Sequence, residues 1–321
     1  AIYATRTLEN PTDRGLTGLL VPVMSCGARL PGYVLIASIF FPTYSTVAVL
    51  TMYIIGIIMA LIAGILLRKT LFKGAAESSL LIEIPAYHMP TLRNVWTEMW
   101  QRTRAFLEGA ATIIMSVSII IWLLMAIPVS GEGHFTDTPV DDSAFAHLAG
   151  AISPAFKPLG FGNWQNASAL ITGFIAKEVV VSTMAQVYHS PQEQGPGEED
   201  TGFWAQGKES VVGLAQAVID TLKTIPSIIG VNLFPPQTES EPPALMTAIR
   251  QGFDQSSGGF GALAAFAFMV YVLLYSPCVA TMAAQRQELG ARWMWTSIAM
   301  QLSLGWLLAL LVFQGGKLLL G

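Results

Sequence analysis

Four long stretches without a single charged residue decide what this chain can fold into. They are Leu30–Leu67, Gly109–Gly131, Gln255–Gln285 and Trp293–Gly316. Each is longer than the roughly 20 residues that an α-helix needs to cross the hydrocarbon core of a bilayer. Charged residues make up 12% of the chain, against about 25% in soluble domains. We therefore predict an all-α, polytopic membrane helical bundle, because a soluble core cannot bury four such stretches.

A lysine and a glutamate, Lys177 and Glu178, interrupt a further apolar stretch at 171–183. A charged side chain near the bilayer centre costs roughly 2.5–3.5 kcal/mol on insertion scales, so it is found mainly where it faces a wet cavity or a partner. Adjacent helical residues do not face one another, so the two charges are expected to serve different partners. The pair predicts a protein that binds or moves something polar. The alternative is that each charge pairs with another helix for packing.

The order of apolar and polar segments divides the chain into four parts. Residues 1–128 hold membrane segments and a predicted cytoplasmic amphipathic helix at 91–106. Residues 129–189 hold a predicted external loop rich in Gly, Asp and Pro, followed by the Lys–Glu segment. Residues 190–257 form a predicted extramembrane helical insertion, and residues 258–321 form the final spans.

Basic residues near the ends of spans predict the orientation. The region 68–104 carries six of them and is expected in the cytoplasm. The loop at 130–165 and the insertion at 190–257 are acid-rich and are expected outside. Both can lie outside only if the segment 166–189 enters the membrane and returns. We therefore favour a re-entrant segment with the charged pair near its turn, and a single crossing is the alternative; such a turn needs cover from protein or a wet cavity.

Two predicted helix breaks carry the candidate metal ligands. The stretches Met24–Pro31 and Tyr275–Thr281 each combine a cysteine, a serine and a helix-breaking proline. A thiolate suits a transition metal rather than Mg²⁺ or Ca²⁺. Paired broken helices are also how many transporters build a binding site near the bilayer midplane. The alternative for each break is an ordinary kink with a packed cysteine, with Arg29 extending to the membrane surface. The candidate ligands are Met24, Ser25, Cys26 and Cys278, and the residues expected to shape the pathway are Gly27, Pro31, Lys177, Pro277 and Thr281.

Other function classes are disfavoured. The sequence has no G-x-x-x-x-G-K-[ST] phosphate loop, so it is not expected to be a P-loop nucleotidase. It also has no basic patch interleaved with aromatic residues, so nucleic acid is not an expected partner. Its two cysteines are too few for a disulfide framework. Glu83 and His88 lie in a short proline-bounded element, where either could bind a metal or serve a structural surface role. The chain begins at Ala1 without an initiator methionine, so we expect it to be a piece of a longer protein.

Taken together, these motifs resemble the membrane half of the bacterial ferrous iron transporter family FeoB. The resemblance runs through nearly the whole chain and is carried, in order, by five stretches: Arg6–Arg14, Pro22–Pro31, Glu83–Pro90, Gly173–Thr183 and Tyr275–Thr281. Of these, Met-Ser-Cys-Gly-Ala-Arg-Leu-Pro and Ala-Lys-Glu-Val-Val-Val are the most specific together.

The resemblance implies a multi-pass permease of the bacterial inner membrane, built on two Gate halves and carrying Fe²⁺ into the cytoplasm. It further implies a preceding G domain that binds GTP with Mg²⁺, and small FeoA-like and FeoC-like partner proteins. Association into a homo-oligomer is left open by the sequence. The first Gate half is expected to be incomplete at 1–128. The family's metal residues carry over onto Cys26, Cys278, Glu83 and Glu178, with Glu178 neutralising the ion and Lys177 tuning the barrier or holding a helix.

Two competing functions stay open at the level of sequence. One is a Gate-type permease for an organic solute such as a nucleoside, which leaves both cysteines without a role. The other is a membrane enzyme with Cys26 or Cys278 as nucleophile, which needs a general base within hydrogen-bond reach. His88 is the plausible base, but it is predicted near the membrane surface.

Overall fold

The computed structural model describes residues 2–8, 10–73, 91–129, 140–177, 179–188, 243–275 and 277–320. Within these ranges every regular element is a helix, apart from an isolated bridge between Pro128 and Ser143, so the all-α prediction is confirmed. The chain separates into one unit of residues 1–188 and 247–321 and a second of residues 189–246. Glu83, His88, Glu178 and most of the predicted insertion lie outside the described residues.

Four helical stretches of the described part are long and apolar enough to cross a membrane: Pro11–Phe40, Pro42–Thr70, Gly261–Leu289 and Ala291–Leu319. The chain is a multi-pass membrane protein. The helix α3 (Ser45–Thr70) is uninterrupted, as its sequence predicts. Its outer face is a stripe of exposed aliphatic side chains, which suits contact with lipid: Val47, Leu50, Ile54, Ile57, Ile58, Leu61 and Ile65.

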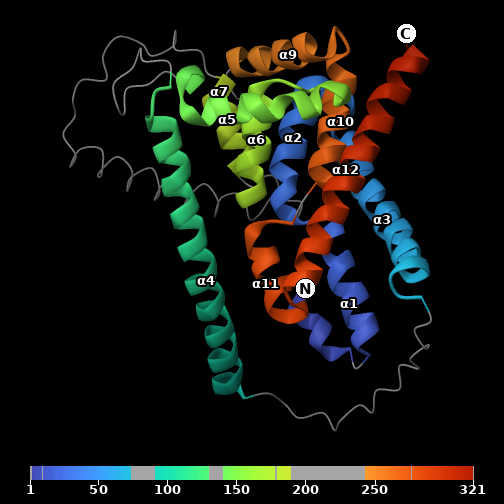
Figure 1. Ribbon diagram of the computed structural model, residues 1–321, viewed down its shortest axis with the longest axis vertical. Coiled ribbons are helices and arrows are strands. Elements are labelled where there is room, and N and C mark those ends of the chain that lie inside the picture. Colours follow the sequence, from blue (N-terminus) through green and yellow to red (C-terminus); the bar gives the residue numbers. More distant parts are fainter. Residues whose placement is uncertain are drawn as a thin grey trace, which may run out of the picture. The chain divides into compact units, whose positions relative to one another are not determined.

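Two of the spans are broken in their middle (Figure 1). In the first, α1 (Pro11–Leu20) is separated from α2 (Leu30–Phe40) by two short 3₁₀ turns and the extended residues 24–26. Pro31 lies in the first turn of α2, where its missing N–H has no helical partner to lose, so it starts this helix. In the second, α10 (Gly261–Leu274) and α11 (Val279–Leu289) flank the break at Pro277. Both predicted breaks are therefore present.

The Lys–Glu segment folds as a helical hairpin. Its arms are α6 (Trp164–Ile175) and α7 (Val179–Tyr188). The start of one arm meets the end of the other, because the Asn163 side chain donates to the Tyr188 hydroxyl at 3.0 Å, and that hydroxyl donates to Asn166 Oδ1 at 3.0 Å. The two arms thus form a hairpin, the shape that the re-entrant interpretation expects, and its entry into the membrane stays a prediction.

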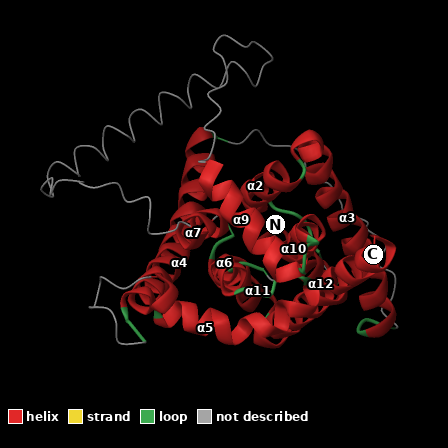
Figure 2. Ribbon diagram, turned by 90° about the horizontal axis from the view of Figure 1, so that it is seen from above, coloured by secondary structure: helices red, strands yellow, loops and turns green. Residues whose placement is uncertain are grey.

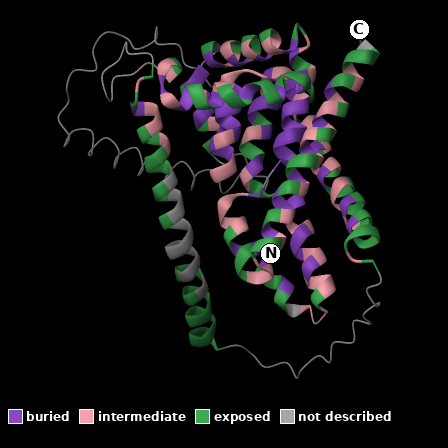
Figure 3. Ribbon diagram, in the orientation of Figure 1, coloured by how far each residue is buried: buried purple, intermediate pink, exposed green. Residues whose placement is uncertain are grey.

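The helix α10 forms the centre of the larger unit. Nearly all of it is buried, and α2, α3 and α12 (Ala291–Leu320) pack around it (Figures 2 and 3). Phe268 of α10 contacts Phe253 of α9 (Pro243–Ser257), with ring centroids 5.5 Å apart, and Phe253 also contacts Phe40 at 5.4 Å. The later part of α9, at the C-terminal end of the predicted insertion 190–257, thus packs on the bundle.

Two further expectations need correction. The amphipathic helix at 91–106 does not end there, because α4 runs without interruption from Leu92 to Ala126. No proline separates the amphipathic part from the apolar part, and a lone glycine costs a helix only about 1 kcal/mol. The predicted loop at 130–165 contains α5 (Ala144–Ile152) and a 3₁₀ helix (Ser153–Leu159). Ser143 caps α5 by accepting from the Ala146 N–H at 3.2 Å, so this serine starts a helix.

One end of the bundle gathers the basic residues that predict the cytoplasmic face. There the ring of Phe72, just after α3, stacks on that of Trp293 in the first turn of α12, at 5.2 Å. The start of α1 and the end of α11 lie at the same end (Figure 1). This end carries Arg68, Lys69, Arg286 and Arg292, whereas both ends of the α6–α7 hairpin that flank loops lie at the opposite end. The arrangement agrees with the orientation predicted from charge.

Candidate metal centre

The two helix breaks and the hairpin turn line one cavity of about 640 Å³. The first break contributes Met24, Ser25 and Cys26, and the second contributes Pro277, Cys278 and Thr281. Lys177 enters the wall from the turn of the hairpin. Three segments far apart in the sequence therefore present polar side chains to the same space. Of the residues predicted to shape the pathway, Lys177, Pro277 and Thr281 line this wall, whereas Gly27 and Pro31 do not.

Both cysteines are free thiols that reach the cavity. Cys26 is exposed in the extended part of the first break. Cys278 directly precedes α11, and its Sγ lies 3.2 Å from the Thr281 hydroxyl. Because neither thiol is locked into a disulfide, both can bind a ligand that enters the cavity. No cluster of three or more His, Cys, Asp or Glu side chains occurs among the described residues, so the two thiols lack a third such partner there.

Arg29 holds the first break together from inside. It is 3% exposed, so it does not extend to the membrane surface, as the alternative interpretation of this break had expected. Its Nη1 donates to the Met24 carbonyl at 3.1 Å and its Nη2 to the Pro22 carbonyl at 3.2 Å. Pro22 belongs to the 3₁₀ turn that follows α1, and Met24 comes directly after that turn. The guanidinium thus bonds to carbonyls of the break that carries it.

Lys177 is a second buried basic residue in the wall. It is 4% exposed, and its Nζ has no hydrogen-bond partner among the described residues. The Nζ lies 5.1 Å from the centroid of the Tyr275 ring, within the range of a cation–π contact. The Tyr275 hydroxyl donates to the Leu170 carbonyl at 3.2 Å, which fixes the ring against α6. The charge at the hairpin turn is therefore held by an aromatic face from the second break.

Close backbone approaches bring these segments together. A Cβ on Gly56 of α3 would lie 3.1 Å from Ser25 Oγ, so the glycine lets the first break pack against α3. A Cβ on Gly173 of α6 would lie 2.5 Å from Val180 Cγ2 and 2.6 Å from the Tyr275 hydroxyl. In α3, Gly56, Ala60 and Gly64 recur every fourth residue, a spacing typical of close helix packing. The close approach at Gly173 has no such counterpart in the local sequence pattern.

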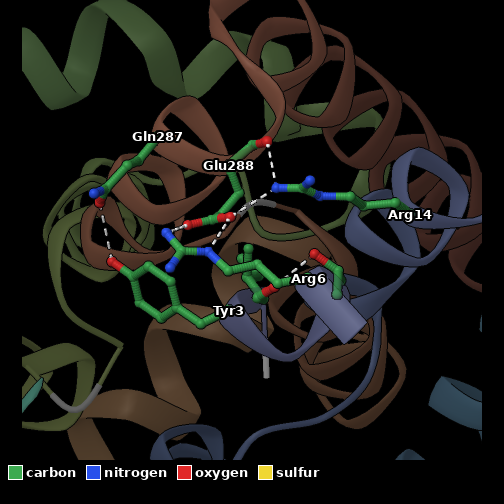
Figure 4. Close-up of polar contacts among 7 residues, drawn as sticks. Tyr3, Arg6, Arg14, Gln287 and Glu288 are labelled. Carbon is green, nitrogen blue, oxygen red and sulfur yellow. Dashed lines mark hydrogen bonds and ion pairs between the residues drawn. The ribbon is translucent and has the colours of Figure 1, made fainter. Parts of the chain in front are cut away.

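An ion-pair cluster anchors the N-terminal 3₁₀ segment, η1 (Ile2–Thr7), to the end of α11 (Figure 4). Arg6 forms a bidentate pair with Glu288, its Nε lying 2.8 Å from Oε2. Arg14 of α1 donates to the same Oε2 at 3.0 Å. Ile2 and Tyr3 of this segment line the cavity, so the cluster holds part of the cavity wall in place.

Sequence reasoning missed several of these contributions. It gave Tyr275 no role, although the residue adjoins the second break, and it did not pair Glu288 with Arg6 and Arg14. A search for isolated charges beside apolar segments would have marked all three charged residues. Their pairing depends on how α1 and α11 pack, which no local pattern encodes.

Comparisons with known proteins agree with this architecture. Residues 49–102 match a family model described as "Ferrous iron transport protein B C terminus", and residues 107–292 match the Gate model described as "Nucleoside recognition". The Fe(2+) transporter FeoB of Legionella pneumophila strain Philadelphia 1 is 36% identical over 99% of this chain and 41% of its own length. The Fe(2+) transporter FeoB of Salmonella typhimurium strain LT2 is 33% identical over 98% of this chain and 40% of its own length.

The chain thus spans about two fifths of the length of these relatives. No solved structure matches it. The Gate model covers more than half of the chain, and the matches to the relatives extend over nearly all of it. The chain therefore belongs to the FeoB family and corresponds to its C-terminal Gate region.

Proposed function

We propose that the chain is the membrane part of a ferrous iron transporter that carries Fe²⁺ across the bacterial inner membrane into the cytoplasm. The observation that carries this proposal is one cavity that both Cys26 and Cys278 line, each from a different broken span. Thiolates suit a first-row transition metal better than they suit Mg²⁺ or Ca²⁺. Relatives named Fe(2+) transporter FeoB support the choice of iron.

In this proposal the two thiols replace part of the water shell of the ion inside the membrane. Met24 and Ser25 lie beside Cys26 and offer a thioether and a hydroxyl, and Thr281 offers a hydroxyl beside Cys278. The charged described residues of the wall, Arg29 and Lys177, are both positive. They oppose a cation, so binding stays weak enough for the ion to leave, which conduction requires. The proposal keeps Glu178 and Glu83 as carboxylates that neutralise the ion along its path.

The proposal extends to the longer protein. There a G domain that binds GTP with Mg²⁺ regulates uptake, FeoA-like and FeoC-like proteins assist it, and the transporter associates into homo-oligomers. The G domain and the small partner proteins follow from the family resemblance.

An organic solute such as a nucleoside fits the site less well. It would leave two free thiols at two helix breaks without a role. An enzyme with a cysteine nucleophile fits less well too, because the described cavity wall contains no histidine or carboxylate to act as general base. Uptake that is abolished by chelation of Fe²⁺ separates the iron transporter from both.

Replacement of Cys26 or Cys278 by serine in the full-length protein tests the proposal. Each variant should lower ⁵⁵Fe²⁺ uptake at least about tenfold, because loss of even an outer-shell partner of a metal costs that much. The control is Ser303→Ala, at an exposed position of α12, which should leave uptake unchanged. Immunoblots of the membrane fraction check that expression is equal. Normal uptake in both cysteine variants would remove the thiols from the mechanism.

Replacement of Lys177 by methionine tests the role of the buried cation. Methionine has a similar length, and removing a buried charge without a described hydrogen-bond partner should leave the fold intact. Without the opposing positive charge, the cavity should bind Co²⁺ about tenfold more tightly, an effect of about 1.4 kcal/mol. A titration followed by the cobalt–thiolate absorption measures this affinity. The matched control is Lys157→Met, at an exposed lysine, and weaker binding in Lys177→Met would show that Lys177 supports the site.

A further inference from the structure

The first turn of α11 holds the sulfur of Cys278 in a defined place. Cys278 is the N-cap residue of this helix, with an extended backbone (φ −67°, ψ 159°), and its side chain makes no capping hydrogen bond. Its Sγ instead lies 3.2 Å from the hydroxyl of Thr281, and both residues line the cavity. The position of this sulfur is therefore set by one side chain rather than by the backbone N–H groups of the helix.

The hydroxyl of Thr281 is placed differently from a typical hydroxyl inside a helix. Such a group commonly donates to the carbonyl four residues earlier, as the Thr296 hydroxyl does to the Arg292 carbonyl at 2.9 Å. Four residues before Thr281 is Pro277, which precedes the helix. The start of α11 thus leaves the threonine hydroxyl beside the Cys278 sulfur, at the wall of the cavity.

Metal binding decides the direction of the hydrogen bond between these two groups. In the free protein either the thiol or the hydroxyl can be the donor. A cysteine that binds a metal has lost its proton, so its sulfur can then only accept, and the hydroxyl must donate. A hydrogen bond to an ionised acceptor is also roughly twice as strong as one between neutral groups. An ion on Cys278 therefore strengthens its contact with Thr281.

We propose that Thr281 is a positioning residue for the metal, acting through Cys278: its hydroxyl donates to the thiolate and orients the sulfur towards the ion. The inference rests on the proposed function, because it concerns the same thiol cavity. Partners that hydrogen-bond to a metal ligand fix its orientation and tune the metal, and their loss typically lowers metal affinity 10–100-fold. The hydroxyl serves the sulfur, and the sulfur binds the ion.

The test records the absorption spectrum of Co²⁺ bound to the full-length protein in detergent. A hydrogen bond holds the electrons of a thiolate more tightly, so its loss lowers the energy needed to move an electron from sulfur to metal. Thr281→Val, which nearly keeps the shape of the side chain, should therefore shift the cobalt–thiolate charge-transfer band to longer wavelength and weaken Co²⁺ binding about tenfold. Thr281→Ser keeps the hydroxyl and should restore both the band and the affinity. The d–d bands, which report the number of ligands on Co²⁺, should stay in place.

The matched control is Thr296→Val, which removes a hydroxyl of α12 that is not part of the cavity wall and should leave the band and the affinity unchanged. A charge-transfer band at the parent wavelength in Thr281→Val would overturn the inference and leave the thiol site intact. Altered d–d bands would do the same, because they would make Thr281 a ligand of the ion itself. A parent protein without any cobalt–thiolate band would overturn the proposed function and this inference together.

Discussion

Replacing Arg29 with methionine should destabilise the protein by about 2–3 kcal/mol, because one buried and one partly buried carbonyl would each lose a charged donor. The carbonyls are those of Pro22 and Met24, which accept from the two Nη atoms. They lie at the helix break of the first span, beside the cavity. Denaturation with sodium dodecyl sulfate, followed by tryptophan fluorescence, measures the free energy of unfolding.

A lysine at the same position should recover only part of this loss. Its single ammonium cannot reproduce the planar fork with which the guanidinium reaches both carbonyls. The control is Arg286→Met at an exposed arginine of α11, which should change the free energy of unfolding by less than about 0.5 kcal/mol. If Arg29→Met were as stable as the parent protein, the arginine would not hold the break together.

Replacing Gly173 with alanine should also cost about 2–3 kcal/mol, because the added methyl group overpacks the hairpin. Its Cβ would lie 2.5 Å from Val180 Cγ2 on the opposite arm and 2.6 Å from the Tyr275 hydroxyl. Both neighbours are buried, so neither can swing into solvent. The arms of the hairpin and the second break must then move apart, which enlarges the cavity and removes Lys177 from the Tyr275 ring. The same denaturation experiment measures the loss.

Gly150→Ala serves as the matched control for this variant. It is also a helical glycine, in α5, but nothing lies within 4 Å of the position of its added Cβ. Alanine should therefore stabilise this helix slightly, by about 0.5–1 kcal/mol. Combining Gly173→Ala with Val180→Ala removes one of the two clashes and should recover part of the loss. Equal stability of the Gly150 and Gly173 variants would refute the close packing of the hairpin.

Prediction from the sequence worked best for features that depend only on whether a segment lies in lipid or in water. Apolar length predicted α3 and the two broken spans, because lipid imposes both a minimum length and internal hydrogen bonding on any segment that crosses it. Charge asymmetry between loops predicted the return of the α6–α7 segment. The cysteines at the two breaks were recognisable because a thiol beside a proline in a span has few ordinary uses.

Features that depend on the partner of a residue could not be predicted. From the sequence, the Arg29 side chain could equally extend to the membrane surface. The folded structure shows that it donates instead to the Met24 and Pro22 carbonyls of the same break. Ser143 and Pro154 signal a loop or a helix start with equal force, and the structure makes them the starts of helices. Gln285 donates to Ser297 on the next helix and to the Gly18 carbonyl, 267 residues away, and no local pattern predicts either partner.

The ion-pair cluster fixes the axial register of α11 on α1. One carboxylate, that of Glu288, receives Arg14 from α1 and Arg6 from the segment before it. Sliding α11 by one helical turn, about 5.4 Å, would separate this carboxylate from both guanidinium groups at once. The ion pairs of Glu288, about three helical turns from Cys278, therefore hold α11 in register with α1, the helix that precedes the break carrying Cys26.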